Sequence, residues 1–259
     1  MRASLLAHGA GAALLAGAPQ LWPQVLGALA LNHAVLTCGM HPRSAMLGRN
    51  LTRLPAGHGA CVALTFDDGP DPEVTPQVLD LLDAHGAKAS FFVLGSRAER
   101  HPALLREMLG RGHGVENHTH DHPFGFACMG PVAQWREVRR AQEAIAAACG
   151  QAPRYFRAPM GLRNPLLDPA LAAEQLSLVS WTRRGLDTRP GPPEQVLARL
   201  TGGLAAGDIL LMHDGSTVRG RGARSTGRRP PVLDVLPGLL HRISALGLTA
   251  IALPPPGDA

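Results

Sequence analysis

Two adjacent carboxylates stand where an apolar run ends. The segment Cys61–Pro70 reads CVALTFDDGP, and Asp67 and Asp68 directly follow β-branched and aromatic residues typical of a strand buried on both faces. Neighbouring carboxylates repel each other unless a cation, an arginine or a shared proton compensates. A polar turn is the simpler interpretation, because Asp-Gly-Pro is common turn chemistry. The pair therefore indicates either a turn or the carboxylate side of a cation site.

A histidine cluster further along the chain could supply the other ligands of such a site. The run Asn117–Pro123 reads NHTHDHP. His118 and His122 are four residues apart, so on a helical turn they could bind one divalent metal ion together. In an extended segment, His118 and His120 would share a face instead. Two histidines and one carboxylate would leave an open position for water. A surface histidine cluster is the alternative, and the carboxylate pair's need for a cation disfavours it.

The elements that must position these residues alternate between strand-like and helix-like segments. Segments with helical periodicity separate apolar runs that end near Phe66, Leu94, His118, Pro159, Thr182, His213 and Leu253. Such an alternation predicts an α/β domain with a parallel sheet, closed or nearly closed as a barrel, with an open doubly wound sheet as the alternative. The carboxyl ends of barrel strands meet at one mouth. The polar residues expected there are Asp67, Asp68, His118, His120, His122, Arg157, Asp187 and His213.

The motifs, taken in order, resemble those of the polysaccharide deacetylase family, also described as NodB homology or carbohydrate esterase family 4. The resemblance covers about residues 61–253 and rests on TFDDGP, NHTHDHP, RAPMG at 157–161 and LMH at 211–213. It implies an α/β fold, a distorted parallel (β/α)7 barrel. It also implies a metal-dependent hydrolase that removes N-acetyl groups from amino sugars of a cell-envelope polysaccharide.

The resemblance assigns the first half of the chemistry to one metal centre and its base. Asp68, His118 and His122 would bind one divalent metal ion, expected to be zinc. Asp67 would deprotonate the attacking water, and Arg157 would hold Asp67 in its ionised form. Arg157 also has a plainer interpretation as a residue that caps a strand.

The second half concerns the leaving group and the substrate. His213 would protonate the departing amine, and Asp187 would orient His213. The plainer interpretations are that His213 belongs to a turn and that Asp187 forms an exposed ion pair. A backbone N–H near Met160 would stabilise the oxyanion, and Leu211 would line a small pocket for the acyl methyl group. In the family an aromatic residue usually follows the aspartate of the fourth motif, whereas Thr188 follows Asp187 here. Trp181 is the candidate to take the place of that aromatic residue in substrate binding. A position in the core is the alternative for Trp181.

The N-terminal segment differs from the rest of the chain. No Asp, Glu, Lys or Arg occurs between Arg2 and Arg43. Residues 1–42 are predicted to form a membrane-associated apolar segment of one or two short helices, about 4–18 and 24–40, with Trp22 at the turn. A hairpin, a single span, a signal peptide cleaved after Ala18 and a buried amphipathic pair all fit. Residues 43–60 are expected to be a linker, 61–254 the deacetylase domain and 255–259 a tail.

The location of the domain depends on which alternative holds. Arginines flank the apolar segment on both sides, so a hairpin would leave the domain in the cytoplasm, whereas a single span would export it. We expect attachment to the inner membrane with an extracytoplasmic domain.

Composition narrows the possible partners. The chain has 25 Lys and Arg against 20 Asp and Glu, a net charge of +5, but no basic groove studded with aromatic residues, which excludes single-stranded nucleic acid. Four scattered cysteines predict neither a disulfide framework nor a zinc knuckle. The arginine-rich stretch 216–231 is either a solvated loop or a contact for phosphate on a lipid carrier or an anionic glycan.

Three functions are therefore compared. The first is N-deacetylation of an envelope polysaccharide. The second is deacylation or deformylation of a lipid-linked amino sugar at the inner membrane. The third is a catalytically inactive relative that binds glycan, which the occupied motif positions disfavour.

Overall fold

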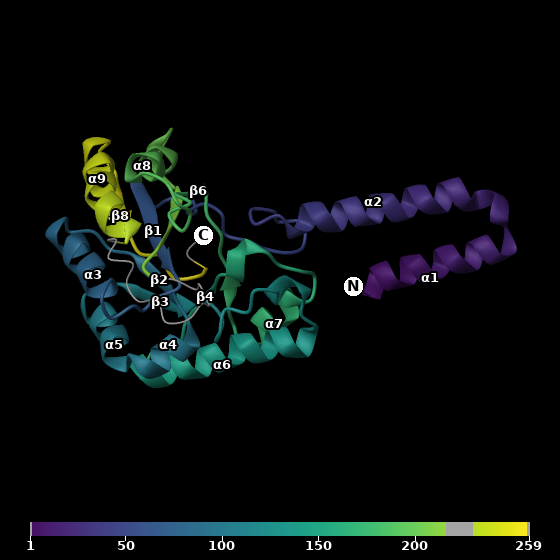
Figure 1. Ribbon diagram of the computed structural model, residues 1–259, viewed down its shortest axis with the longest axis horizontal. Helices are drawn as coiled ribbons and strands as arrows, with labels where there is room; N and C mark the ends of the chain where they lie inside the picture. The colour runs from purple at the N-terminus through teal and green to yellow at the C-terminus, as the bar shows by residue number, and fades with distance from the viewer. Residues whose placement is uncertain (1, 216–229, 258–259) are drawn as a thin grey trace.

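The strand predicted at Cys61–Asp67 forms as β1 and lies within a parallel sheet (Figure 1). The structure is a computed structural model that describes residues 2–215 and 230–257. Most of the arginine-rich stretch 216–231, whose role was left open above, lies outside the described residues. β1 pairs in parallel with β2 (Ser90–Val93), β7 (Ile209–His213) and β8 (Thr249–Ile251).

The sheet is curled, and its two edge strands follow each other in the chain. Its strand order is β5-β4-β3-β2-β1-β7-β6, which adds β3 (Gly114–Asn117), β4 (Tyr155–Phe156), β5 (Ser177–Leu178) and β6 (Arg183–Arg184). The two edge strands are only four residues apart in the chain, so one extended stretch pairs first with β4 and then with β7. The predicted distorted parallel barrel is thereby confirmed.

Helices cover the outside of the sheet (Figure 1). They are α3 (Thr75–Ala84), α4 (Gly95–Arg100), α5 (Pro102–Gly110), α6 (Pro131–Cys149), α7 (Leu167–Ala173), α8 (Pro193–Thr201) and α9 (Pro231–Ala245), with 3₁₀ turns η2 (Phe126–Cys128) and η3 (Pro159–Gly161). Alternate strand residues such as Leu64 and Phe66 face these helices, whereas Ala63 and Leu211 face the barrel interior. A core on each side of the sheet therefore fixes the strand ends that carry the polar residues.

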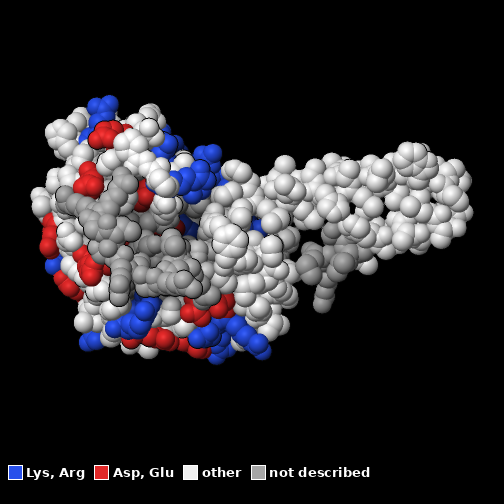
Figure 2. All heavy atoms as spheres, in the orientation of Figure 1, with Lys and Arg blue, Asp and Glu red and all other residues white. Residues whose placement is uncertain are grey.

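Residues 2–40 form a helical arm that projects from the domain (Figure 1). The arm consists of α1 (Arg2–Gly17), the 3₁₀ turn η1 (Pro19–Leu21) and α2 (Trp22–Met40), so the two predicted helices are present. α1 contacts α2 through the His8 and His33 rings, whose centroids are 5.1 Å apart. The sequence has no charged residue between Arg2 and Arg43, and Figure 2 shows none on the visible face of α2. None of the helices within the described residues is long and apolar enough to cross a membrane.

The segment between the arm and the domain, residues 42–54, is here called the strap. It was predicted to belong to a linker, but it is bound to the barrel. Leu51 pairs in parallel with Val179, and Arg53 pairs with Asp208, so the strap lies where the chain passes from β5 to β6. Backbone hydrogen bonds make these contacts, from Leu51 N to Leu178 O and from Ser180 N to Leu51 O. Backbone pairing does not depend on side-chain type, which is why the sequence pattern did not indicate it.

Candidate metal centre and catalytic site

Three ligand atoms from two strand ends converge at the barrel mouth. The Oδ1 atom of Asp68 lies 3.4 Å from Nε2 of His118 and 3.6 Å from Nε2 of His122. One ligand atom from each residue lies within 4.8 Å of the others. Asp68 Oδ1 is buried and accepts no hydrogen bond from any described residue. A buried acceptor without a donor is costly, and a cation would satisfy it. These residues therefore fit a divalent metal ion.

The two histidines are brought together by a tight turn and not by a helix. Asp68, Thr119, His122 and Met160 all have positive φ, at 73°, 69°, 49° and 56°. Non-glycine residues rarely adopt this conformation, and such strain concentrates at functional sites. The third histidine, His120, points elsewhere: its Nε2 lies 3.3 Å from Oε1 of Glu99 on α4. The choice of His118 and His122 as partners agrees with the geometry, although the helical turn assumed for them is absent.

The surroundings of His118 prepare it as a ligand. Its Nδ1–H donates to the carbonyl oxygen of Arg157 at 2.8 Å, so Nε2 points toward Asp68. Burial opposes ionisation of Asp68, but the neighbouring His118, His213 and His122 outweigh it and lower the pKa of Asp68. Burial also lowers the pKa of His122, and the charge of His118 adds to this effect. Burial opposes protonation of His118, but Asp67 and Asp68 outweigh it and raise the pKa of His118. Because a metal-ligating histidine must be neutral, a metal ion bound here would displace the Nε2 proton of His118.

Asp67 lies on the other side of this cluster and is held by a buried arginine. Arg157 is 0% exposed, and its Nη1 donates to Asp67 Oδ1 at 2.7 Å and to Thr65 Oγ1 at 2.9 Å. The guanidinium lies 4.1 Å from the centroid of the Phe92 ring, a cation–π contact. Asp67 and Asp68 therefore have different partners, which explains how the two carboxylates can be adjacent.

His213 and Asp187 form a second unit at the same mouth. Both oxygens of Asp187 accept hydrogen bonds from His213, Oδ1 from Nδ1 at 2.9 Å and Oδ2 from the backbone N–H at 2.8 Å. Burial disfavours the charged imidazole, but the hydrogen bond and charge of Asp187 outweigh it and raise the pKa of His213 to about 9. The imidazolium can therefore donate a proton from Nε2 at neutral pH.

The three expected substrate contacts differ in their accessibility. Met160 is 44% exposed in η3, and its backbone N–H donates no hydrogen bond to any described residue, as an oxyanion donor should. Leu211 is buried on the inner face of β7. Trp181 is only 5% exposed, and its ring contacts the guanidinium groups of Arg157 and Arg184, so its burial favours the second interpretation given for it, a place in the core. Its ring is part of the core beneath the site.

Sequence reasoning missed two residues that shape the site. Asp214 is buried directly after His213, and its Oδ2 accepts from Thr75 Oγ1 at 2.6 Å. Its carboxylate packs so closely on Gly69 that a Cβ there would lie 2.4 Å from it. Burial raises the pKa of Asp214 to about 7. Ser180, discussed below, contacts Arg157. For Asp214 the only sequence signal was its place beside His213; for Ser180 there was none.

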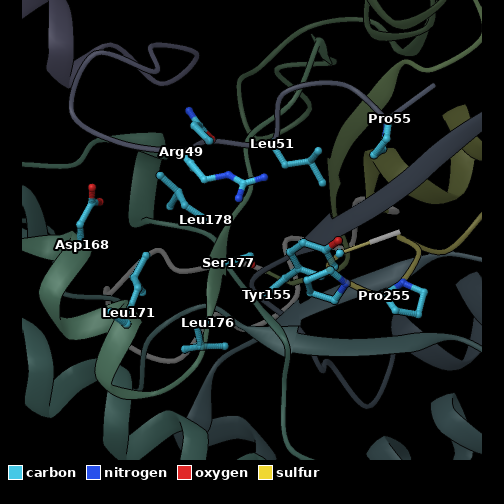
Figure 3. Close-up of a pocket in the computed structure, with 14 residues that line it drawn as sticks. Arg49, Leu51, Pro55, Tyr155, Asp168, Leu171, Leu176, Ser177, Leu178 and Pro255 are labelled. Carbon is cyan, nitrogen blue, oxygen red and sulfur yellow. The ribbon is translucent and has the colours of Figure 1, made fainter. Parts of the chain in front are cut away.

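A cavity of about 640 Å³ lies apart from this site, beside the edge strand β5. Figure 3 shows Arg49 and Leu51 of the strap along one side of the cavity and Ser177 and Tyr155 below them. The lining comes from the strap, α7, the starts of β4 and β5 and the segment after β8, whereas the metal cluster lies at the carboxyl ends of β1 and β3. The cavity is thus no extension of the metal centre.

Comparison with known proteins agrees with this geometry. A family model described as polysaccharide deacetylase matches residues 55–179. A chitooligosaccharide deacetylase of Bradyrhizobium sp. (strain ANU 289) is 41% identical over 156 residues, which cover 60% of this chain and 70% of the relative. A peptidoglycan-N-acetylglucosamine deacetylase of Bacillus cereus is 32% identical over 196 residues, covering 74% and 66%.

A solved structure gives the same result. The family 4 carbohydrate esterase from Streptomyces lividans in complex with acetate superposes with a TM-score of 0.65 at 30% identity, covering 74% of this chain and 92% of the other. From these matches the chain belongs to the polysaccharide deacetylase family and is a polysaccharide N-deacetylase.

Proposed function

We propose that the protein removes N-acetyl groups from N-acetylglucosamine units of a cell-envelope glycan, using a divalent metal ion, zinc, held by Asp68, His118 and His122. The observation that carries the proposal is the buried, unpartnered Oδ1 of Asp68 facing two histidine Nε2 atoms at 3.4 and 3.6 Å. The relatives named chitooligosaccharide and peptidoglycan-N-acetylglucosamine deacetylases support this substrate class.

The proposed reaction divides between the two sides of the mouth. A metal ion bound there would polarise the acyl oxygen and lower the pKa of water. Asp67, held in place by the hydrogen bond from Arg157, takes the proton of the attacking water as the water oxygen bonds to the acyl carbon. The Met160 N–H donates to the developing oxyanion. His213, charged because Asp187 raises its pKa, gives its Nε2 proton to the departing amine as the C–N bond breaks.

The test measures metal content and product together. The purified full-length protein loaded with zinc should release acetate from chitooligosaccharides or from peptidoglycan fragments. Asp68→Ala should lower the bound zinc well below one ion per chain and abolish this release. Retention of full zinc stoichiometry by Asp68→Ala would show that the ligand set is wrong. Failure of the zinc-loaded wild type to release acetate from either glycan would refute the substrate class.

The arm, which has no Asp, Glu, Lys or Arg after Arg2, favours a second candidate, a lipid-linked amino sugar as substrate. Leu6, Leu14, Leu26 and Leu31 are exposed on the arm, and Trp22 is exposed where η1 passes into α2. Exposed apolar side chains without charges suit contact with a lipid bilayer. We propose on this basis that the arm associates with the inner membrane and that the domain lies on its extracytoplasmic side.

Two measurements separate this candidate from a soluble glycan substrate. Leu26→Glu with Leu31→Glu should abolish flotation of the protein with liposomes. If the substrate is lipid-linked, the same change should lower acetate or formate release from a lipid-linked amino sugar in vesicles and spare a soluble chitooligosaccharide. Equal activity of wild type and variant on the vesicle substrate would remove this candidate. Labelling of the exposed Cys128 by an impermeant maleimide in spheroplasts would test the side of the membrane.

A further inference from the structure

Ser180 lies between the strap and the buried arginine of the site. It is 3% exposed, and each of its three polar groups has a partner. Its backbone N–H donates to Leu51 O at 2.8 Å, and its hydroxyl donates to Pro42 O at 2.5 Å. Its carbonyl oxygen accepts from Nη2 of Arg157 at 2.9 Å. Two of the three groups thus bind the strap, and the third holds the guanidinium.

The contact with Ser180 helps to fix the direction of the guanidinium. Arg157 donates through Nη1 to Asp67 and Thr65 and through Nη2 to Ser180, while its Nε has no partner among the described residues. The ring of Phe92 contacts the guanidinium at 4.1 Å but accepts no directional hydrogen bond from it. A shift of the Ser180 carbonyl would therefore rotate the guanidinium and move the hydrogen bond to Asp67.

The strap itself is held in a definite conformation. Asn50 Nδ2 donates to Pro42 O at 2.9 Å and to Ser44 O at 3.1 Å, so the carbonyl that receives the Ser180 hydroxyl is fixed from a second side. Arg163 is buried and donates through Nη2 to Ser44 O at 3.0 Å and to Gly48 O at 3.1 Å. These bonds connect the strap to itself and to the loop after η3.

The strap also contacts the loop that carries the candidate oxyanion donor. Gly161, the residue after Met160, has a φ of 73°, and a Cβ added there would lie 2.9 Å from Cβ of Pro42. This close approach needs a glycine. The strap therefore contacts the loop that carries Met160 and, through Ser180, the buried Arg157. In the sequence the strap precedes residues 55–179, which the family model matches.

We propose that Ser180 is a positioning residue for Asp67, acting through Arg157, and that the strap supplies the two carbonyl groups that hold it. The inference rests on the proposed function, in which Asp67 is the base. It makes the segment between arm and domain a working part of the active site, so that residues remote from the metal cluster set the geometry of the base.

The test uses the full-length, zinc-loaded protein and acetate release. Ser180→Ala removes the bond to Pro42, and Asn50→Ala loosens the same carbonyl without altering the domain. Each should lower kcat about tenfold, since small misplacements of catalytic groups have effects of this order or larger. KM and zinc stoichiometry should stay unchanged, and Ser180→Thr, which keeps the hydroxyl, should restore kcat.

Matched controls separate positioning from general damage. Ser177→Ala removes a hydroxyl from the same stretch, and Arg49→Ala changes a strap side chain on the cavity wall; neither side chain hydrogen-bonds within the described residues. Both controls should keep kcat within about twofold of the wild type, the scale of substitutions that lack a named structural role. Losses in the controls equal to those in Ser180→Ala and Asn50→Ala would overturn the proposal.

A double-mutant cycle then identifies the route. In an Arg157→Met background, where the guanidinium is gone, Ser180→Ala should cause no further loss of kcat, because residues acting through one another are not additive. An equal fold-loss in both backgrounds would overturn the route through Arg157. The proposed function fails separately, if the wild type releases no acetate or if Asp67→Asn retains full turnover.

Discussion

Replacing Asp187 with asparagine should turn a nearly pH-independent proton donor into one that fails above neutral pH. In the folded protein both oxygens of Asp187 accept from His213, and the pKa of His213 is raised to about 9 from its ordinary 6.5. The amide introduced by Asp187→Asn would keep one acceptor oxygen but lose the negative charge. Without that charge the pKa of His213 should fall toward its ordinary 6.5, because burial disfavours the imidazolium and only the charges of Asp67 and Asp68 still raise it.

The size of the effect depends on pH in a defined way. The two pKa values differ by an amount equivalent to about 3 kcal/mol at ~1.4 kcal/mol per pH unit. At pH 8 the protonated fraction of His213 should fall from about 0.9 to about 0.03, roughly a thirtyfold loss of kcat/KM if the imidazolium is the acid. At pH 6 the same calculation gives a loss of less than about twofold.

The assay is the kcat/KM for acetate release between pH 6 and 9.5. The alkaline limb should move from about pH 9 in the wild type to about pH 6.5 in the variant. Asp80→Asn is a matched control, because Asp80 forms an exposed ion pair with Arg111, and it should leave the limb in place. A uniform loss at every pH, with the alkaline limb unmoved, would refute His213 as the charged acid.

Asp187→Asn should also change the free energy of unfolding. A histidine whose folded-state pKa is raised stabilises the fold below its unfolded pKa, about 6.5, and this contribution disappears as the pH rises through about 9. The variant should therefore be less stable than the wild type in urea at pH 6, and the two proteins should converge near pH 10.

Other substitutions test the remaining parts of the site and fold. Asp67→Asn should keep one zinc ion per chain while kcat falls by about 10²–10⁴-fold, the usual contribution of a general base; retained turnover would place the base elsewhere. Phe124 is 85% exposed two residues after the ligand His122, and we expect it to stack on a sugar ring. Phe124→Ala should raise KM by about 3- to 10-fold, as the loss of ~0.5–1.5 kcal/mol of ring stacking predicts, and leave kcat unchanged; an unchanged KM would exclude this contact, and the exposed Val132→Ala serves as control. Burial lowers the pKa of His113 to about 4, so its contribution to stability is lost as the pH falls from about 6.5 toward 4, and the loss reaches about 2 kcal/mol at pH 5. Urea unfolding at pH 7 and pH 5 should show a smaller acid loss in His113→Asn than in the wild type, and equal losses would contradict the assignment.

The sequence was sufficient where side-chain chemistry and strand ends carry the information. Asp67 and Asp68 follow an apolar strand, and the parallel arrangement required that Arg157 and His213, at other strand ends, face the same mouth. The pairing of Asp68 with two histidines could also be predicted, because a buried carboxylate pair needs positive charge nearby. These inferences depend on residue type and position along a strand, both of which the chain displays directly.

The sequence was insufficient where backbone conformation or backbone hydrogen bonds determine which residues meet. The left-handed conformations of Thr119 and His122 turn His120 toward Glu99 and bring His122 to the metal cluster, and spacing alone does not encode such a turn. The strap pairs through backbone groups, so its Gly- and Pro-containing sequence resembled that of a linker. For Trp181 the sequence left substrate binding and the core as alternatives, because an aromatic residue near a site can serve either, and only its burial in the structure favours the core.

The buried Arg157 explains why the strap matters more to chemistry than to stability. Removing a guanidinium from water is costly, and one buried ion pair seldom returns that cost, so apolar replacements of such pairs often fold as well or better. Here the guanidinium donates a hydrogen bond to Asp67 at the candidate metal site, where it directs that carboxylate. Such a charge is useful only if its direction is fixed, and Ser180 supplies the remaining hydrogen-bond acceptor that fixes it. We therefore expect substitutions in the strap to change kcat more than they change the free energy of unfolding.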